Sequence, residues 1–257
     1  AGRIASATML TTLLDFAHAG DMKVFIDDAQ IDAIEERMRK QGFLDAAALQ
    51  KTFSILRAND MIFSFVVNNY MLGREPFPFD ILFWNEDSTN LPAAFHAYYL
   101  RHMYLHNDLI KANKLTIAGV KMDLSTIKTP LYFLSTREDH IAPWGATYEG
   151  AAMISRTNPH VRFTLAASGH VAGVVNPPGA KKYGFWTGTV DTRRVGRALP
   201  PSSSEWLDHT DYTDGSWWPD WAAWTARHAG DRIDPPSMGS KKYPATDPAP
   251  GTYVAGK

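Results

Sequence analysis

Residues 131–140 read LYFLSTREDH, an apolar run followed at once by charged residues, and this stretch decides the fold. Pro130 stands just before the run, where a strand loses little from a missing backbone N–H. A run of this length is typical of a strand that is buried on both faces, here over residues 131–135. A helix is predicted over 143–157 and a second strand over 161–165. This strand–helix–strand order predicts two neighbouring parallel strands and an α/β fold.

The chain before this unit is predicted to hold one strand and a long helical stretch. Residues 8–16 read TMLTTLLDF, which is typical of a buried strand. Residues 21–114 are mainly helical in pattern. An apolar stripe indicates a first helix that stops at Gly42, a second helix covers 45–56, and a long one covers 91–110. Because the chain starts directly on a buried strand and without Met, we expect it to be a fragment.

Other segments are less regular. Residues 61–71 are apolar without a clear period, so a helix and a strand both stay open. Residues 115–120 read as a short strand. The end of the chain is irregular, with a loop at 200–204, a short helix whose aromatic face spans Trp217 to Trp224, and a surface tail over 231–257.

Composition narrows the classes of function. The 257 residues are 45% hydrophobic and 21% charged, which is enough apolar material for a large core. The 26 basic residues nearly balance the 27 acidic ones, so no overall field favours nucleic acid or an anionic membrane. No apolar run is long enough to span a membrane, and no signal peptide is apparent. The chain has no cysteine, which excludes disulfides, thiolate metal sites and a cysteine nucleophile within it and fits a cytosolic protein.

Two side chains suited to proton transfer follow the two strands of the central unit. Asp139 comes just after the first strand, and His170 just after the second. Because both strands end at one edge of a parallel sheet, we expect the two side chains within about 2.6 to 3.2 Å of each other. Acid before histidine is the chain order of the α/β-hydrolase triad, in which the carboxylate orients the imidazole. The alternative is that Asp139 caps a helix and His170 is a surface loop residue.

A serine nucleophile is not indicated. An α/β-hydrolase nucleophile sits in a G-x-S-x-G turn, and no serine of this chain has glycines on both sides at that spacing. Ser135 and Ser168 fall near the predicted sheet edge without such a turn. We interpret Ser168 as a turn residue that bonds to the backbone.

Six segments of the chain resemble, in order, segments of polyhydroxyalkanoate synthases. They are PFDILFWN (78–85), YLRH (99–102), REDHIAPW (137–144), SGHVAGVVNPP (168–178), GSWWPDW (215–221) and PAPGTYV (248–254). The resemblance runs along nearly the whole chain and looks most like the single-subunit class that uses short-chain monomers.

The resemblance implies an α/β-hydrolase fold, of which this chain holds the C-terminal part of the parallel sheet, with an inserted helical cap. Residues 1–20 would then give a core strand, and 21–114 the cap that covers the site. Residues 115–195 would form the core with the acid and the histidine, and 196–257 a C-terminal helix and surface tail.

The resemblance also implies an acyltransferase that polymerises 3-hydroxyacyl groups from coenzyme A thioesters, with release of coenzyme A. Its triad is Cys–His–Asp, with Asp139 as the acid and His170 as the base. The cysteine would lie upstream of this chain, so we expect the chain alone to be inactive. Coenzyme A arrives with the substrate, and no further cofactor and no metal are expected. A homodimer, a polymer granule surface and a cytoplasmic, granule-associated location are implied too.

Weaker expectations attach to further residues. Trp84, Tyr99 and Ala172 match family positions that look like the lining of an acyl pocket or its entrance, although ordinary core packing would explain them equally well. His140 neighbours the acid, where it either contacts the site or is a structural histidine.

Other features leave competing functions open. His102 and His106 stand at i and i+4 and could present two metal ligands, but no carboxylate at a suitable spacing completes a set. The tryptophans at 217–224 read as packing or as part of a granule or subunit surface. An esterase or depolymerase on the same fold, and an inactive cap that only binds partners, remain the alternatives.

Overall fold

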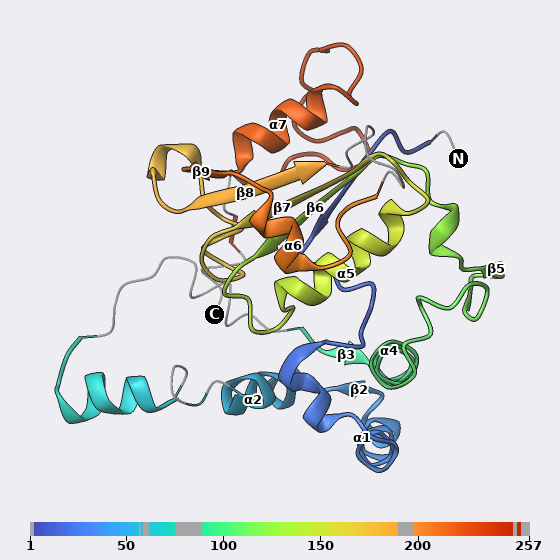
Figure 1. Ribbon diagram of the computed structural model, residues 1–257. Coiled ribbons are helices and arrows are strands. Elements are labelled where there is room, and N and C mark those ends of the chain that lie inside the picture. The colour runs from blue at the N-terminus through green and yellow to red at the C-terminus, as the bar shows by residue number, and fades with distance from the viewer. Residues whose placement is uncertain are drawn as a thin grey trace.

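The computed structural model describes residues 3–56, 58, 62–75, 89–189, 198–248 and 251–252. Figure 1 shows a twisted sheet with helices on both faces and, below it, a second group of helices. The sheet has five strands in the order β1-β6-β7-β8-β9. The strands are β1 (Ala7–Leu10), β6 (Leu131–Thr136), β7 (Val161–Ala166), β8 (Gly184–Thr189) and β9 (Tyr212–Asp214).

The predicted strand–helix–strand unit is confirmed. Strands β6 and β7 are parallel neighbours, and Leu134 pairs with Thr164 in their register. Helix α5 (Trp144–Ser155) connects them. Strand β1 is parallel to β6, whereas β8 and β9 join the other side in antiparallel order. The fold is therefore α/β with a mixed central sheet.

Successive strand residues point to opposite sides of the sheet, so each face carries its own set of apolar side chains. Helices cover both faces. Leu131, Phe133 and Phe163 pack with Tyr148 of α5 on one face, where Trp206 of α6 (Ser203–Asp208) joins them. On the other face, helix α7 (Trp218–Ala226) covers a second cluster. That cluster consists of Tyr132, Leu134, Ala166, Phe185, Trp217 and Trp224. Two layers of helix thus enclose strands that are apolar on both faces.

Polar contacts fix α7 on the sheet. Asp220 accepts hydrogen bonds from Arg162 Nε and from the hydroxyl of Tyr132, both at 2.9 Å, and Arg162 Nη2 also reaches the carboxylate. Burial raises the pKa of Tyr132 well above its ordinary value, so its hydroxyl stays a donor. Trp221 donates its indole N–H to the Thr8 hydroxyl at 2.9 Å. The helix is therefore bonded to β1, β6 and β7.

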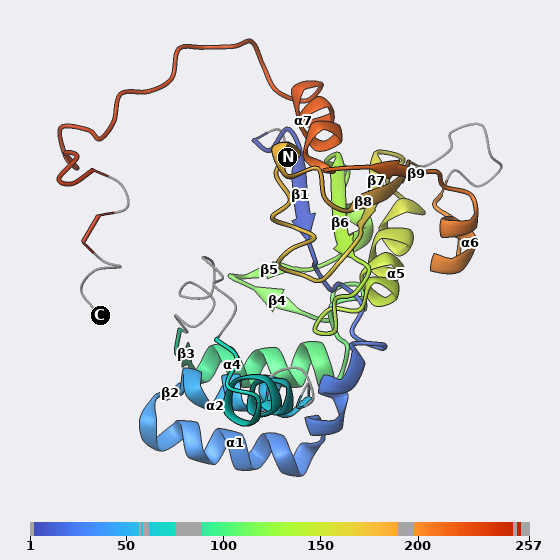
Figure 2. The same cartoon turned by 90° about the vertical axis from the view of Figure 1, so that its left-hand side faces the viewer.

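A second group of helices lies beyond the ends of β1 and β6, as Figure 2 shows. It contains a 3₁₀ turn (Gly20–Phe25), α1 (Asp28–Gln41), α2 (Ala46–Leu56), α4 (Ala93–Tyr99) and two π-helical turns, Val66–Met71 and Leu100–Leu105. Strands β2 (Phe43–Leu44) and β3 (Leu91–Pro92) pair within this group, apart from the main sheet.

Helix α1 shows why the sequence folds this way locally. Asp27 caps its start, because the carboxylate accepts a hydrogen bond from Gln30 N at 2.8 Å. Gly42 ends the helix with φ 83°, a left-handed conformation that favours glycine. Arg101 then ties the helix to the π-helical turn by reaching Asp32 Oδ1 at 2.5 Å and Glu35 Oε1 at 2.7 Å.

Two predicted strands are wrong in extent. The strand expected over 8–16 is only β1, because Thr11 turns the backbone to φ 44° and ends the ladder. Leu14 and Phe16 are still buried, but from a loop that packs on helices rather than from a strand. The strand expected over 115–120 is instead a hairpin of β4 (Thr116–Ile117) and β5 (Val120–Lys121). Ala118 and Gly119 form its turn with φ 49° and 78°, as two-residue hairpin loops require.

The end of the chain is more regular than predicted. Strands β8 and β9 were not expected, and the loop predicted at 200–204 gives way to α6, whose first turn Ser202 caps. The predicted aromatic helix is α7. The open segment 61–71 is helical in its described part. Short 3₁₀ turns at Leu124–Thr126 and Pro178–Ala180 complete the elements.

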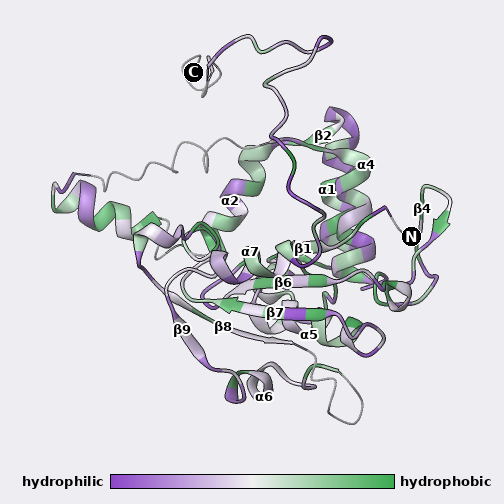
Figure 3. Ribbon diagram, turned by 90° about the horizontal axis from the view of Figure 1, so that it is seen from above, coloured by the Kyte–Doolittle hydropathy of each residue, from purple (hydrophilic) through white to green (hydrophobic). Residues whose placement is uncertain are grey.

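Two described segments leave the body of the molecule. The helix that holds Val66–Met71 projects outward, and in Figure 3 hydrophobic and hydrophilic residues alternate along it. Tyr70 and Met71 are 88% and 70% exposed there. After α7 the chain extends away as a tail (Figure 2), and residues 231–248 are exposed. None of the described helices combines the length and apolar character needed to cross a membrane.

Candidate active site

The loops that follow β6 and β7 lie against each other. Arg137 N donates to Ala166 O at 2.9 Å, and Glu138 N donates to Ser168 O at 3.0 Å. These bonds continue the pairing of the two strands by two residues beyond their ends. The loops therefore carry Asp139 and His170 to the same edge of the sheet, as the parallel arrangement requires.

Asp139 and His170 face each other across this edge. Oδ1 of Asp139 lies 3.7 Å from Nδ1 of His170. The distance is longer than the about 2.6 to 3.2 Å that we expected and lies outside hydrogen-bond range. The Asp139 side chain is only 1% exposed, whereas that of His170 is 33% exposed. The histidine thus stands between a buried carboxylate and the surface.

Backbone amides fix the orientation of the carboxylate. Asp139 Oδ1 accepts from Ile141 N at 2.8 Å and from Ala142 N at 3.0 Å. This is a turn-capping role, because the two amides belong to the turn that leads into α5. Asp139 therefore caps this turn rather than helix α5, whose N-cap is Pro143, and the same oxygen is the one nearest to His170.

His140 lies beside the pair. Its ring and that of His170 meet edge to face, with centroids 5.2 Å apart and planes at 60°. The ring contact brings His140 against His170, and whether His140 belongs to the site or is a structural histidine stays a prediction. Gly20 approaches the same loop from the helical group, where a Cβ would come within 2.9 Å of Pro143 Cγ. The positive φ of 70° at Gly20 adds to the need for glycine there.

Two tryptophans hold the turn that follows His170. The indole N–H of Trp217 donates to Gly173 O at 3.0 Å and to Val174 O at 3.2 Å, and that of Trp218 donates to Val174 O at 3.0 Å. A Cβ on Gly173 would lie 2.7 Å from both Ala167 O and Thr136 Cγ2, so the turn has no free space. The sequence analysis interpreted these tryptophans as packing or as part of a granule or subunit surface, and no local signal pairs them with a turn more than forty residues earlier.

The two serines near the sheet edge occupy other roles. Ser135 is buried in β6, and its hydroxyl pairs with that of Thr147 at 2.5 Å. Ser168 has φ 74°, and its carbonyl accepts the hydrogen bond from Glu138. Ser168 is therefore a turn residue, as predicted, and neither serine is presented as a nucleophile.

The expected pocket residues are only partly described. Tyr99 belongs to an aromatic cluster, in which its ring centroid is 5.9 Å from that of Phe16 and 5.6 Å from that of Tyr104. Burial raises the pKa of the Tyr99 phenol. Ala172 is half-buried in the turn after His170. Trp84 lies outside the described residues. Whether any of them lines an acyl pocket stays a prediction.

His102 and His106 do not converge on a common point. Their ring centroids are 6.5 Å apart, and His102 Nδ1 instead contacts Asp108 Oδ2 at 3.0 Å. The sequence analysis did not find this carboxylate, because Asp108 comes after the end of the helix and does not lie on the helix face that carries the two histidines. Within the described ranges, no group of three histidine or acidic residues is placed to hold a metal ion.

Asp139 Oδ1 lies 3.7 Å from one ring nitrogen of His170. A carboxylate that hydrogen-bonds one ring nitrogen orients an imidazole and stabilises its protonated form during a reaction. The other nitrogen can then take a proton from a nucleophile and return it to a leaving group.

Comparison with known proteins gives the family. No family model matches the chain. The chain is 47% identical over 253 residues to a poly(3-hydroxyalkanoate) polymerase of Methylorubrum extorquens. The matched stretch covers 98% of this chain and 40% of that protein. The chain is 45% identical over 259 residues to the polymerase subunit PhaC of Cupriavidus necator, with 98% and 42% covered. Poly(3-hydroxyalkanoate) polymerase 1 of Ectopseudomonas oleovorans is 34% identical over 253 residues, with 98% and 43% covered.

The chain thus spans about two fifths of the length of these relatives. The alignments include both loops that carry Asp139 and His170, because they cover 98% of the chain. Over the stretch that it covers, the chain belongs to the poly(3-hydroxyalkanoate) polymerase family.

Proposed function

We propose that this chain is the part of an acyltransferase that supplies the acid and the base of a Cys–His–Asp triad. The enzyme would polymerise 3-hydroxyacyl groups from coenzyme A thioesters into polyester. Asp139 orients His170, and His170 moves the protons. The cysteine nucleophile is supplied from outside the 257 residues, since the chain contains none.

The proposed reaction has two steps that balance. In the first, His170 takes the thiol proton, the sulfur attacks the thioester carbonyl, and coenzyme A leaves as a thiol with that proton. In the second, His170 takes the proton of a 3-hydroxyl group whose oxygen attacks the acyl-cysteine. An ester forms, and the cysteine leaves as a thiol. Each step needs an imidazole that can accept and return one proton.

The observation that carries the proposal is the pairing of Asp139 with His170 at the carboxyl edge of β6 and β7, with 3.7 Å between carboxylate and ring. The loops that bring them together are bonded by backbone groups, and a buried acid beside a half-exposed histidine suits a base that works on an external group. The names of the relatives give the substrate class.

Related proposals follow from the same resemblance. The sheet would be the C-terminal part of an α/β-hydrolase core, and residues 21–114 its cap. The position of α1, α2 and α4 beyond the ends of β1 and β6 supports this (Figure 2). We propose further that the complete enzyme is a homodimer that acts at the surface of a polymer granule in the cytoplasm.

Reconstitution tests the proposal. This chain is mixed with a cysteine-bearing segment of a relative, and coenzyme A release from 3-hydroxybutyryl-coenzyme A is followed. We expect no turnover by the chain alone and turnover by the mixture. His170→Ala in the mixture should lower the rate about 10² to 10⁴-fold, the usual contribution of a positioned general base.

His209→Ala is the matched control, because this histidine is exposed and its Nδ1 contacts the carbonyl of Glu205, at 2.7 Å. It should leave the rate unchanged. Turnover by the chain alone would show that no outside cysteine is needed. Full activity of the His170→Ala mixture would remove His170 from the role of base.

A further inference from the structure

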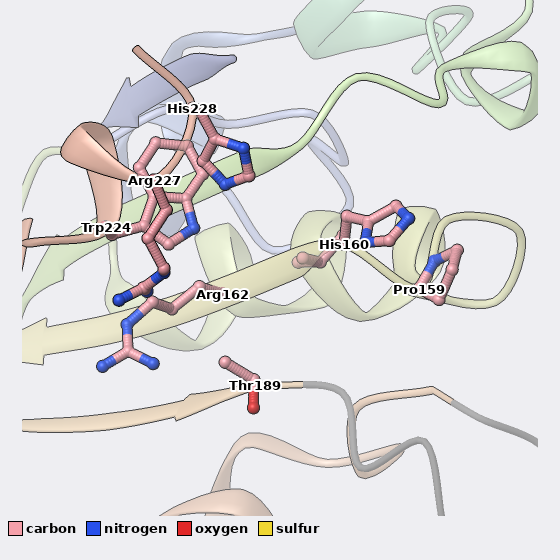
Figure 4. A pocket seen from close by; sticks show the side chains of 8 residues that line it. Pro159, His160, Arg162, Thr189, Trp224, Arg227 and His228 are labelled. Atoms are coloured by element: carbon pink, nitrogen blue, oxygen red, sulfur yellow. The ribbon is translucent and has the colours of Figure 1, made fainter. Parts of the chain in front are cut away.

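A small cleft opens at the end of the sheet opposite to Asp139 and His170. His160 comes just before β7, and Thr189 is the last residue of the antiparallel strand β8, so both lie at the amino end of β7. The cleft has a volume of about 180 Å³ and is walled on its third side by the end of α7. Its lining is Pro159, His160, Val161, Arg162, Thr189, Trp224, Arg227 and His228, shown in Figure 4.

The polar groups of this cleft are almost all donors. Arginine, the tryptophan indole and protonated histidine donate hydrogen bonds and accept none. Two arginines and two histidines stand in the lining, and no carboxylate is among the described residues that form it. The chain as a whole has a net charge of −1, so this concentration of basic groups is a local feature and does not reflect a basic protein.

Arg162 is held in place before any ligand arrives. Its Nε and Nη2 are bonded to the carboxylate of Asp220, and its side chain is 17% exposed. The carboxylate of Asp220 pairs with Arg162, and among the described residues no ion pair is found for Arg227. In Figure 4 both guanidinium groups extend to the same side of the cleft.

The remaining walls give the cleft a firm shape. Trp224 is 5% exposed, and its ring contacts that of His228 with centroids 4.6 Å apart. Thr189 lines the cleft from the strand side. Because pockets for drug-sized molecules usually measure about 300 to 1,000 Å³, this one suits a single compact charged group.

We propose that this cleft binds a phosphoryl group, either free phosphate or the end of a small phosphomonoester. The planar guanidinium of Arg227 pairs with two phosphoryl oxygens, and Arg162 supplies the second charge from its fixed position. The histidines bond to the oxygens that remain. The site lies at the far end of the strands from the proposed acid and base, so an occupant would act on the enzyme from a distance.

Binding is tested on this chain without any turnover, so the result is independent of the proposed acyltransferase activity. Calorimetric titration with inorganic phosphate and with glycerol 3-phosphate is run at constant ionic strength set with chloride. We expect saturable binding of at least one of the two, and the tighter one identifies the source of the phosphoryl group. Arg227→Gln should raise the dissociation constant about tenfold or more, as expected for the loss of charge-assisted hydrogen bonds.

Arg232→Gln is the matched control, because Arg232 is exposed in the tail. The substitution removes the same charge, but from outside the cleft. It should bind as the unchanged chain does. Circular dichroism without phosphate checks that both variants keep the fold. The absence of saturable binding would overturn the proposal, and so would equal weakening by the two variants, which would indicate a general charge effect.

Discussion

Replacing Trp217 by phenylalanine tests whether the tryptophans hold the turn after His170. Phenylalanine keeps an aromatic ring against Tyr132, whose centroid is 6.3 Å away, but it removes the indole N–H. Gly173 O then loses its 3.0 Å hydrogen bond, while Val174 O keeps the one from Trp218. The turn containing His170 should become less stable and more mobile.

The magnitude follows from burial. Gly173 is buried, and a buried carbonyl without a partner costs about 1 to 3 kcal/mol. The smaller phenylalanine ring also lowers the free energy of unfolding, so the control variant must lose the same ring volume. Trp224→Phe serves for this, because Trp217 and Trp224 are both 5% exposed and the indole of Trp224 bonds to no described residue. We expect Trp217→Phe to be less stable than Trp224→Phe by about 2 kcal/mol, which lowers Tm by about 4 to 8 °C.

Thermal unfolding followed by circular dichroism measures this difference. Amide hydrogen exchange localises it, because Gly173 N and Val175 N bond within the turn, to Gly169 O at 2.7 Å and Val171 O at 2.8 Å. These two amides should exchange faster in Trp217→Phe and not in Trp224→Phe. Equal Tm values for the two variants, with unchanged exchange in the turn, would refute a holding role for Trp217.

Three further predictions rest on other contacts. Gly173→Ala should cost about 1 to 3 kcal/mol by overpacking, seen in denaturant unfolding, because backbone atoms that cannot move aside meet its Cβ; a variant as stable as the parent would contradict this. Burial by itself would raise the pKa of Asp108. The hydrogen bonds from His102 and Lys111 outweigh burial and hold the pKa of Asp108 below its ordinary value. The stabilisation is therefore present above the ordinary carboxyl pKa and is lost as the pH falls through the lowered one. Asp108→Asn should flatten the acid-unfolding curve in that range, and an unchanged curve would count against the pairing. Arg162→Met should destabilise by up to about 3 kcal/mol, less than for a fully buried pair because both partners are partly exposed. Adding Asp220→Leu should recover part of that loss in urea unfolding, and no recovery would show that the carboxylate tolerates the absence of its partner.

The central part of the fold could be predicted from the sequence because its signals are local. The apolar run at 131–135 and the run at 161–165 are each buried on both faces, and the helix between them has its own pattern. Proximity of Asp139 and His170 followed from strand order alone. Their separation of 3.7 Å did not, because it depends on the two amides that turn the carboxylate toward α5.

The parts that could not be predicted depend on contacts between distant residues or on single backbone angles. Strand β8 contains glycine and polar residues and forms because β7 offers it a free edge. The break after β1 comes from one positive φ at Thr11, a residue that rarely adopts it. The bonds from Trp217 and Trp218 join segments that no periodic pattern connects.

The contact between Trp221 and Thr8 has a consequence for synthesis. These residues are 213 positions apart, and the helix that carries Trp221 covers the sheet face bearing Tyr132 and Leu134. During translation that face stays open to other chains until the helix has left the ribosome, long after the first strands are complete. Contacts of such sequence separation also form slowly. Shortening the chain before residue 218 would therefore leave that face of the sheet permanently exposed.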